Sequence, residues 1–290
     1  MTCTLCPRRC GADRDIAVGF CGMGNTLTAA RAGLHFWEEP CISGFGGAGA
    51  IFFSGCNLCC VYCQNRAISR GKTGMAVTPE RLREIYFSLI AQGVHNVSLV
   101  TASHFLEAVL ASLREPLPVP VVWNSGGYDS VEAIRRLSGK VQIVLPDIKY
   151  SDPALAARYS AAPDYPETAK AAIWEMFRQT GPYVIGEDGI MKSGVIIRHL
   201  VLPGALDNTF GVIDWVRETF RPGDVLFSLM SQYTPYRQVP GMPELDRRLT
   251  AEEYDAAVGY MEEAGIEDGF YQELSSAKEE YTPDFDLTGV

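Results

Sequence analysis

Residues 52–65 read Phe52-Phe53-Ser54-Gly55-Cys56-Asn57-Leu58-Cys59-Cys60-Val61-Tyr62-Cys63-Gln64-Asn65 and place four cysteines within eight positions. Such close spacing favours thiolate ligands for zinc or for an iron–sulfur cluster. Two spacings are open, Cys56-x3-Cys60-x2-Cys63 and Cys56-x2-Cys59-x3-Cys63. Either supplies three thiolates, whereas a fully ligated four-iron cluster uses four. A three-cysteine cluster therefore leaves one iron open for a small molecule.

The other five cysteines all lie before this loop, and eight of the nine fall within the first 60 residues. Cys3, Cys6, Cys10 and Cys21 have spacings that suit zinc or an auxiliary [4Fe–4S] cluster, and free thiols remain the alternative. Cys41 and Cys59 taken alone are explained equally well as small buried hydrophobes. The sequence therefore predicts one cluster site and a candidate second metal site.

The composition limits the class of protein. The chain has 290 residues, of which 47% are hydrophobic and 21% are charged, an ordinary balance for a globular protein. No apolar run approaches the roughly 20 residues that span a bilayer, and the first residues show no basic-then-apolar signal segment. We therefore expect a cytoplasmic protein without a membrane partner. A large chain of this kind with an odd number of cysteines argues against a disulfide scaffold.

The net charge of −10 is unevenly distributed. Residues 251–290 carry twelve Asp and Glu against one Lys, which leaves 24 basic and 23 acidic groups in the other 250 residues. A body this neutral argues against nucleic-acid binding. The acidic end is in part a solvated helix face, and Gly269-Phe270-Tyr271-Gln272 and Tyr281-Thr282-Pro283-Asp284-Phe285 predict a packed aromatic tail.

Strand-like apolar runs alternate with helical stretches along the rest of the chain. The runs lack clean alternation, as expected for parallel strands buried on both faces. They cover residues 50–53, 96–101, 119–124, 141–149, 195–202 and 224–230. The pattern predicts an α/β fold with a parallel sheet that is either flat or wound into a barrel. We place a Cys-rich N-terminal extension at residues 1–49 and the α/β domain, with its acidic end, at 50–290.

Helix start signals support this pattern. Thr78 before Pro79 predicts a cap, Asp129 is expected to cap a helix that runs to Leu137, and Thr250 with Glu253 predicts a capping box. Residues 166–180 are predicted to be helical, with Ile173, Trp174 and Phe177 in the core. Gly44-Phe45-Gly46-Gly47-Ala48-Gly49 matches G-x-G-x-x-G, but it leads into a strand rather than opening a helix, so we interpret it as a turn.

The cysteine loop resembles that of radical S-adenosylmethionine (SAM) enzymes, which is C-x3-C-x2-C with an aromatic residue before the last cysteine. The resemblance selects Cys56, Cys60 and Cys63 as cluster ligands and Tyr62 as the aromatic residue. Three stretches are similar to the PflX-like branch, whose members resemble pyruvate formate-lyase activating enzyme. They are Glu38-Glu39-Pro40-Cys41-Ile42-Ser43-Gly44, Gln64-Asn65 and the N-terminal Cys3-x2-Cys6-Pro7-Arg8-Arg9-Cys10.

This resemblance implies a partial (β/α)6 barrel with the loop at its C-terminal mouth, which is where barrels place their chemistry. It implies an oxidoreductase with two cofactors, a [4Fe–4S] cluster and SAM. Reduced by a one-electron donor such as flavodoxin or ferredoxin, the cluster would cleave SAM to methionine and a 5′-deoxyadenosyl radical. That radical would take a hydrogen atom from a partner glycyl-radical enzyme, or from a peptide, nucleotide or small metabolite. A non-catalytic electron-transfer or zinc-scaffold protein is the alternative from another class.

Polar residues at the strand ends are the candidate SAM contacts, because barrel strands end at the site. The resemblance implies Gly-Gly-Glu after the second run, but the chain has Thr101-Ala102-Ser103-His104. Thr101, Ser103 or His104 could replace that motif, and a helix cap by Ser103 is the structural alternative.

Three further strand ends supply candidates. Asn124 and Ser125 could hydrogen-bond a ribose or carboxylate, or simply form a turn. Asp147 and Lys149 resemble the family's Asp-x-Lys, with a structural salt bridge as the alternative. Arg198 lies in a strand similar to the family's Arg…Pro-Gly strand and could pair with the SAM carboxylate. Ser231-Gln232-Tyr233-Thr234-Pro235 is polar enough for a substrate wall.

Overall fold

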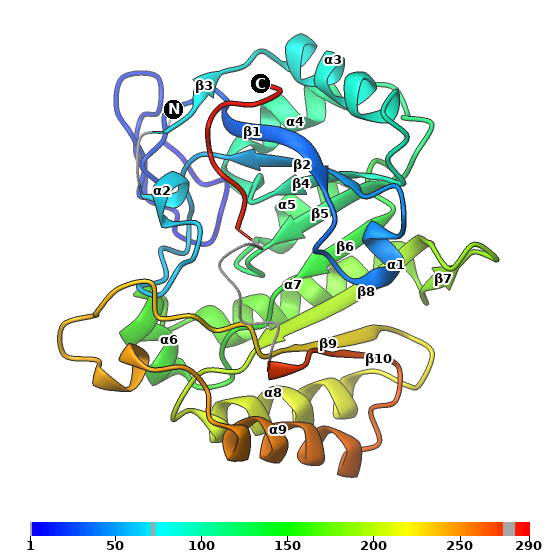
Figure 1. Cartoon of the computed structure of the whole chain (residues 1–290). Helices are drawn as coiled ribbons and strands as arrows, with labels where there is room; N and C mark the ends of the chain where they lie inside the picture. The colour runs from blue at the N-terminus through cyan, green and yellow to red at the C-terminus, as the bar shows by residue number, and fades with distance from the viewer. Residues whose placement is uncertain (1, 71–72, 275–281) are drawn as a thin grey trace.

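A ten-stranded mixed sheet forms the centre of the computed structural model, which describes residues 2–70, 73–274 and 282–290 (Figure 1). The strands follow the order β10-β9-β8-β6-β5-β4-β2-β1-β3, and β7 pairs with β8 outside this path. The sheet therefore has two free edges, and it curves into a partial barrel rather than closing.

The six predicted strands are all present, and neighbouring members pair in parallel. Almost every residue in them is buried, because helices cover one face and the barrel interior the other. The prediction of a parallel α/β sheet is confirmed, in its barrel form. The strands are β2 (Ala48–Phe53), β4 (Val97–Val100), β5 (Val121–Ser125), β6 (Ile143–Pro146), β8 (Met191–Leu200) and β9 (Leu226–Met230).

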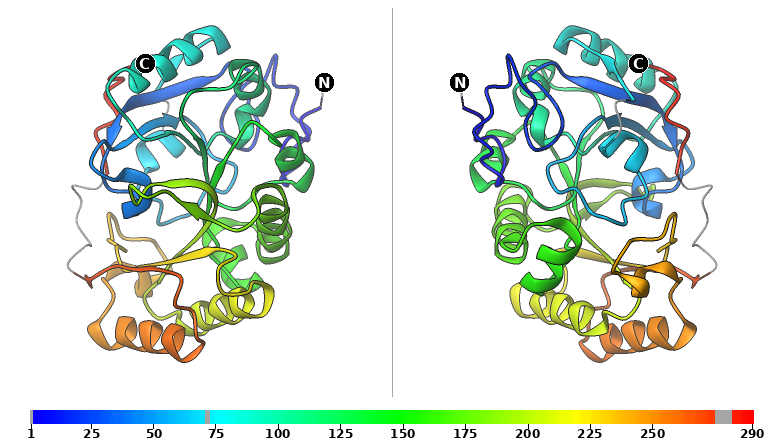
Figure 2. Two further views of the ribbon diagram at one scale, coloured as in Figure 1. Left: turned by 90° about the vertical axis from the view of Figure 1, so that its right-hand side faces the viewer. Right: turned by 90° about the vertical axis from the view of Figure 1, so that its left-hand side faces the viewer.

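Helices α3 to α9 surround the outside of the curved sheet, as the side views in Figure 2 show. Except for α6, their apolar faces and the outer face of the sheet form the largest core cluster, whereas Ala156 and Tyr159 of α6 pack in a second cluster with Cys60. The helices are α1 (Pro40–Ser43), α2 (Arg66–Ser69), α3 (Pro79–Ile90), α4 (Leu106–Ser112), α5 (Val131–Arg136), α6 (Pro153–Ser160), α7 (Tyr165–Thr180), α8 (Leu206–Thr219) and α9 (Ala251–Glu263), with 3-10 turns η1 (Ser103–Phe105) and η2 (Pro243–Asp246).

The predicted helix caps are confirmed at two positions and wrong at one. Thr78 accepts a hydrogen bond from the Arg81 backbone, and Thr250 forms the capping box with Glu253. The cap of α5 is Ser130, not Asp129, because the Ser130 hydroxyl accepts from the amide of Ala133. Asp129 lies one residue earlier and is buried, and the Trp123 indole donates to it.

Helix α7 begins one residue before the predicted range, and Ile173 is fully buried as expected. Trp174 is 49% exposed, so its placement in the core is wrong. It lies on the outer side of the helix, where its ring packs against Phe177 and Phe220.

Four further strands extend the sheet beyond these six, and the sequence pattern did not reveal them. They are β1 (Thr28–His35), β3 (Met75–Ala76), β7 (Val184–Ile185) and β10 (Gly269–Tyr271). Strand β1 runs antiparallel to β2, so the sheet includes residues before position 48. Among the described residues no helix has both the length and the apolar character needed to cross a membrane.

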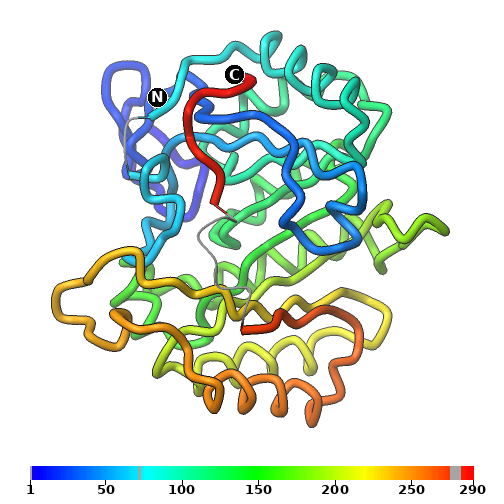
Figure 3. The backbone as a smooth tube through the Cα atoms, viewed as in Figure 1, coloured from blue at the N-terminus to red at the C-terminus, as the bar shows by residue number. Residues whose placement is uncertain are grey.

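The C-terminal segment returns to the first strand, as the tube in Figure 3 shows. The Ala32 amide donates to the Thr288 carbonyl at 2.8 Å, and the Leu287 amide donates to Ala30 at 3.1 Å. Phe285 packs edge-on against Phe52, with ring centroids 5.5 Å apart. Over the described residues the packed tail is confirmed at Phe270 and Phe285, whereas Tyr271 is 59% exposed, and Tyr281 lies outside those residues. The glycine stretch at 44–49 joins α1 to β2, and Gly47 adopts a φ of 76° there.

Candidate radical-cluster site

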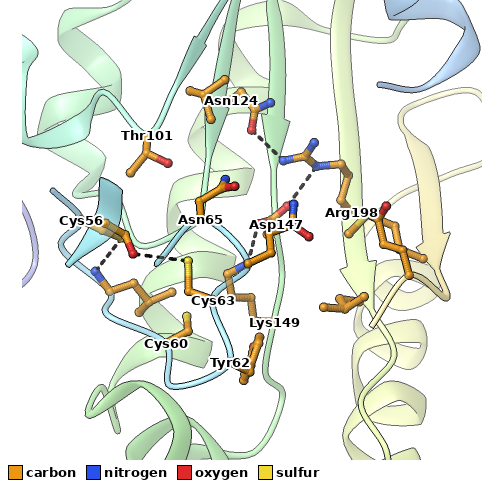
Figure 4. A pocket seen from close by; sticks show the side chains of 18 of the residues that line it. Cys56, Cys60, Tyr62, Cys63, Asn65, Thr101, Asn124, Asp147, Lys149 and Arg198 are labelled. Carbon is orange, nitrogen blue, oxygen red and sulfur yellow. Dashed lines mark hydrogen bonds and ion pairs between the residues drawn. The ribbon is translucent and has the colours of Figure 1, made fainter. Parts of the chain in front are cut away.

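A cavity opens at the C-terminal ends of the parallel strands, and residues of β2, β4, β5, β8 and β9, together with Asp147 and Lys149 just after β6, contribute to its wall (Figure 4). The cysteines of the loop after β2 lie on one side, with Asn124 and Arg198 across from them. Its lining includes Glu38, Cys56, Cys59, Cys60, Tyr62, Cys63, Asn65, Thr101, Asn124, Ser125, Asp147, Lys149, Arg198, Gln232, Tyr233 and Thr234.

The three predicted cluster ligands all face this cavity, and polar hydrogens point at each sulfur. The Leu58 amide lies 3.4 Å from the Cys56 sulfur, the Ser160 hydroxyl 3.1 Å from Cys60 and the Ser69 hydroxyl 3.5 Å from Cys63. Hydrogen bonds of this kind stabilise thiolates and tune the potential of iron–sulfur clusters. Cys59 also lines the cavity, but its thiol donates to the Cys56 carbonyl at 3.2 Å.

The donor set fits a three-cysteine [4Fe–4S] cluster. Burial raises the pKa of Cys60 and raises that of Cys63 to about 11, and neighbouring thiols add to both shifts. Iron bound there would hold both groups as thiolates, because a metal cation reverses the local preference for the neutral form. Over the residues that the structure describes, no three His, Cys, Asp or Glu side chains are arranged for a single metal ion. A cluster spreads its thiolates over several irons, so this finding is compatible with it.

Arg8 of the N-terminal segment holds the cysteine loop through hydrogen bonds to its backbone. Its guanidinium donates to the backbone carbonyls of Asn57 at 2.8 Å, Leu58 at 3.0 Å and Ser160 at 2.7 Å, and to Ala161. These bonds join the N-terminal segment, the loop and the end of α6. An arginine fork is suited to this task because its five N–H groups have fixed directions.

Opposite the loop lies a buried charge network centred on Arg198. Its guanidinium donates to Asp147 at 2.9 Å, to Glu38 at 2.9 Å and to the Asn124 side-chain oxygen at 2.7 Å. Lys149 donates to the other Asp147 oxygen at 2.5 Å. The four charged side chains are each less than one-fifth exposed. Solvent therefore has little access to the network, and its hydrogen bonds hold the charged groups in fixed positions.

The two carboxylates of this network differ in protonation tendency. Burial acts to raise the pKa of Asp147, but Lys149 and Arg198 outweigh burial and hold it below its ordinary value. For Glu38, burial dominates and raises the pKa, although Arg198 opposes the shift. Burial likewise acts to lower the pKa of Lys149, but Asp147 and the Cys60 thiol raise it overall. Asp147 and Lys149 thus form an ion pair beside the cysteine loop.

Most of the predicted SAM contacts reach the cavity, but two do not. Tyr62, Thr101, Asn124, Ser125, Asp147, Lys149 and Arg198 line it. Ser103 and His104 are buried and do not line it, and the His104 Nε2 atom lies 2.7 Å from the Ser54 carbonyl. Thr101 adopts a φ of 60°, and the chain turns there into the 3-10 turn that contains both residues. The structure therefore gives these two residues a packing role.

Glu38 is the site residue that sequence reasoning missed. The stretch around it was noted only for its resemblance to the PflX-like branch, and nothing in the sequence predicts its pairing with Arg198, 160 positions later. Its contact occupies one side of the guanidinium, while Asp147 and Asn124 occupy the others. Each guanidinium nitrogen of Arg198 thus makes one bond to a protein group, and Arg198 still lines the cavity, so its predicted pairing with the SAM carboxylate stays a prediction.

The comparisons with known proteins agree with this site. Residues 42–148, which contain all three loop cysteines, match the family model for a 4Fe-4S single cluster domain. An uncharacterized protein, MJ0674, of Methanocaldococcus jannaschii is 27% identical over 275 residues, which are 91% of this chain and 75% of that protein.

Two solved structures align with part of this chain, and the first of them reaches a TM-score of 0.50. SuiB of Streptococcus suis, solved bound to the precursor peptide SuiA, aligns with a TM-score of 0.50 at 14% identity over 77% of this chain. This chain spans 48% of SuiB. A domain of pyruvate-formate lyase-activating enzyme from Bacteroides vulgatus aligns with a TM-score of 0.38 at 14% identity, over 67% of this chain and 91% of that one. The Cys56-x3-Cys60-x2-Cys63 loop at the mouth of the partial barrel thus lies within the residues that match a 4Fe-4S single cluster domain.

Proposed function

We propose that this protein binds SAM in the cavity beside Cys56, Cys60 and Cys63 and cleaves it reductively to start a radical reaction. The observation that carries the proposal is the set of three cysteines facing one cavity opposite a buried Asp147–Lys149 pair. When bound there, a [4Fe–4S] cluster supplies the electron that cleaves SAM to methionine and a 5′-deoxyadenosyl radical. Three protein ligands leave one iron for the SAM amino acid.

Lys149 is the group we assign to the SAM carboxylate. It lies in the cavity wall close enough to Cys60 for the two charges to interact, and it is cationic at neutral pH. Its partner Asp147 is anionic and offers an acceptor for the SAM amino group. Arg198 and Asn124 act as positioning residues, because they hold Asp147 and Glu38 from behind.

The rim of the cavity favours a substrate that is larger than a small metabolite. Trp37 and Tyr236 line the cavity and remain 55% and 41% exposed. Exposed aromatic rings of this kind suit contact with a polypeptide segment, since they bury large area at low entropic cost. We therefore propose a protein substrate, such as the glycine-containing loop of a glycyl-radical enzyme, ahead of a nucleotide.

The central test is SAM cleavage by the reconstituted protein. The protein, loaded with iron and sulfide, is reduced with dithionite or with flavodoxin or ferredoxin, and 5′-deoxyadenosine is measured by liquid chromatography. We expect wild-type protein to form it and Cys60→Ala to form none. Cys41→Ala is the matched control: Cys41 is equally buried but belongs to another core cluster. Cleavage by Cys60→Ala at the wild-type rate would refute the cluster assignment.

The proposed substrate has a separate test. The protein is incubated with SAM and a candidate glycyl-radical enzyme, and the mixture is examined by electron paramagnetic resonance. An organic radical on the partner supports activation. If SAM is cleaved but no candidate partner acquires a radical, the proposal of a glycyl-radical partner fails while SAM cleavage stands. If no SAM is cleaved, the protein is instead a non-catalytic iron–sulfur protein.

A further inference from the structure

The end of helix α6 lies against the cysteine loop and is held there by backbone hydrogen bonds. The Val61 amide donates to the Tyr159 carbonyl at 2.8 Å. The Arg8 guanidinium, which holds the loop carbonyls, also donates to the Ser160 carbonyl at 2.7 Å. The helix ends directly after Ser160, where Ala161 adopts a left-handed conformation with a φ of 49°. The backbone of Ser160 is therefore fixed beside the loop.

The side chain of Ser160 points at one of the three cluster ligands. Its hydroxyl donates to the Cys60 sulfur at 3.1 Å, and the Tyr150 hydroxyl lies 2.7 Å from it on the other contact. The donors at Cys56 and Cys63 are farther from their sulfurs, at 3.4 Å and 3.5 Å. Ser160 is 1% exposed and Tyr150 is fully buried, so water does not compete for these groups. A hydrogen bond in such surroundings is electrostatically stronger than in water.

The hydrogens of these hydroxyls can be assigned by counting, since each hydroxyl carries one. Ser160 has two possible acceptors, the Cys60 sulfur and the Tyr150 oxygen. A thiolate bound to iron is charged, and charged acceptors form the stronger hydrogen bonds, so Ser160 donates to the sulfur. Tyr150 then supplies the hydrogen of its contact with Ser160, which leaves Tyr62 as the donor in the contact of 2.8 Å between the two tyrosine hydroxyls. Tyr150 thus orients the Ser160 hydrogen towards Cys60.

A donor at this sulfur favours the reduced form of a cluster held by the loop. Such a cluster accepts one electron from its reductant and passes it to SAM, so its reduced form carries more negative charge than its oxidised form. A hydrogen that points at a ligating sulfur stabilises the more negative form. Hydrogen bonds to the sulfurs are among the features that set the potentials of iron–sulfur clusters. The expected effect of the Ser160 hydroxyl is therefore a higher reduction potential.

We propose that the Ser160 hydroxyl, oriented by Tyr150, donates to the Cys60 sulfur and raises the reduction potential of the cluster. This inference rests on the proposed function, because it requires that Cys60 bind the cluster. Ser160 and Tyr150 are positioning residues, since neither lines the cavity in which SAM would bind. They act through Cys60, so their replacement changes the potential without removing a contact to SAM.

A redox titration of the reconstituted protein, followed by electron paramagnetic resonance, tests this proposal. Ser160→Ala removes the donor, and Tyr150→Phe removes the hydroxyl that orients it but keeps the ring. At a fixed potential we expect the ratio of reduced to oxidised cluster to fall about tenfold in Ser160→Ala, which is a shift of about 59 mV to lower potential. Tyr150→Phe should shift the potential in the same direction by less. Both variants should bind as much iron per chain as the wild type.

Ser112→Ala and Tyr86→Phe are the matched controls. The Ser112 and Tyr86 hydroxyls are also buried and lie 2.9 Å apart, but they join α4 to α3 and do not line the cavity. Both controls break a buried serine–tyrosine pair that has no contact with the cysteine loop. They should therefore keep the wild-type potential.

Three results would overturn the role of Ser160: an unchanged potential in Ser160→Ala, a higher one, or an equal fall in Ser112→Ala. If Ser160→Ala takes up no iron, Tyr150→Phe decides, and a wild-type potential in that variant overturns the proposal. Failure of the proposed function looks different. A cluster whose potential depends on Ser160 but which cleaves no SAM contradicts the proposed function alone, whereas a wild-type protein that takes up no cluster overturns both.

Discussion

Replacement of Arg198 by methionine removes the centre of the buried charge network while keeping most of the side-chain volume. The guanidinium makes three hydrogen bonds, to Asp147, Glu38 and Asn124, and the two carboxylates are only 15% and 9% exposed. Removing one partner of a buried ion pair costs about 3–5 kcal/mol, because the remaining charge is left uncompensated. For a protein of this size that corresponds to a fall of about 10 °C in melting temperature.

The assay is chemical denaturation of Arg198→Met at pH 5 and pH 8, with Arg136→Met as the control. Arg136 also pairs with a glutamate through two hydrogen bonds, but both side chains are more than one-third exposed. An exposed pair contributes at most about 1 kcal/mol. A loss in Arg198→Met no larger than that in Arg136→Met would refute the reasoning.

The pH dependence of the loss has a definite sign. Burial already raises the pKa of Glu38, and Arg198 opposes that shift, so the pKa rises further when Arg198 is removed. A group whose pKa is raised on folding favours the folded state at low pH and loses this contribution as the pH increases. We therefore expect the destabilisation to be larger at pH 8 than at pH 5. An equal loss at both values would contradict the role of Glu38.

Three further variants test other parts of the account. Lys149→Met should weaken SAM binding about tenfold, measured by equilibrium dialysis, because it removes the proposed carboxylate contact. Gly127→Ala should destabilise the fold by more than about 1 kcal/mol in urea titration, since a methyl group would lie 2.0 Å from the Asp147 carbonyl. The Arg247 hydrogen bond lowers the pKa of Glu253 to about 2, so Glu253→Gln should lose stability at pH 7 and progressively less as the pH falls below 4.

Each of these variants has a result that would count against its argument. Unchanged SAM affinity in Lys149→Met would mean that a residue other than Lys149 contacts the SAM carboxylate. Wild-type stability of Gly127→Ala would mean that the turn before α5 can shift without displacing Asp147. A stability difference for Glu253→Gln that stays constant down to pH 3 would show that its ion pair with Arg247 contributes nothing.

The sequence predicted the centre of the molecule well. The six parallel strands were found because runs rich in Val, Ile and Leu are buried on both faces, and their ends correctly indicated one edge of the sheet. The short edge strands β3, β7 and β10 were not found. Each has two or three residues. These residues are extended because they pair with a longer neighbouring strand, and their own composition does not indicate a strand.

The site was predicted less completely than the fold, because the direction of a side chain depends on the local backbone conformation. The turn at Thr101 directs Ser103 and His104 into the core, and the helix cap is Ser130, the residue directly after the predicted Asp129. The engagement of Arg198 by Glu38 depends on a contact between distant segments, which no local pattern encodes.

The most direct test of the central claim is the electron paramagnetic resonance spectrum of the reduced loop cluster with and without SAM. It is recorded on the reconstituted protein, and Cys60→Ala identifies the signal of the cluster that Cys56, Cys60 and Cys63 hold. A three-cysteine cluster has an iron that SAM can ligate, whereas a cluster with four cysteines has none. We predict that SAM shifts the g-values of the spectrum. A spectrum that SAM leaves unchanged would contradict the proposal that this site binds SAM.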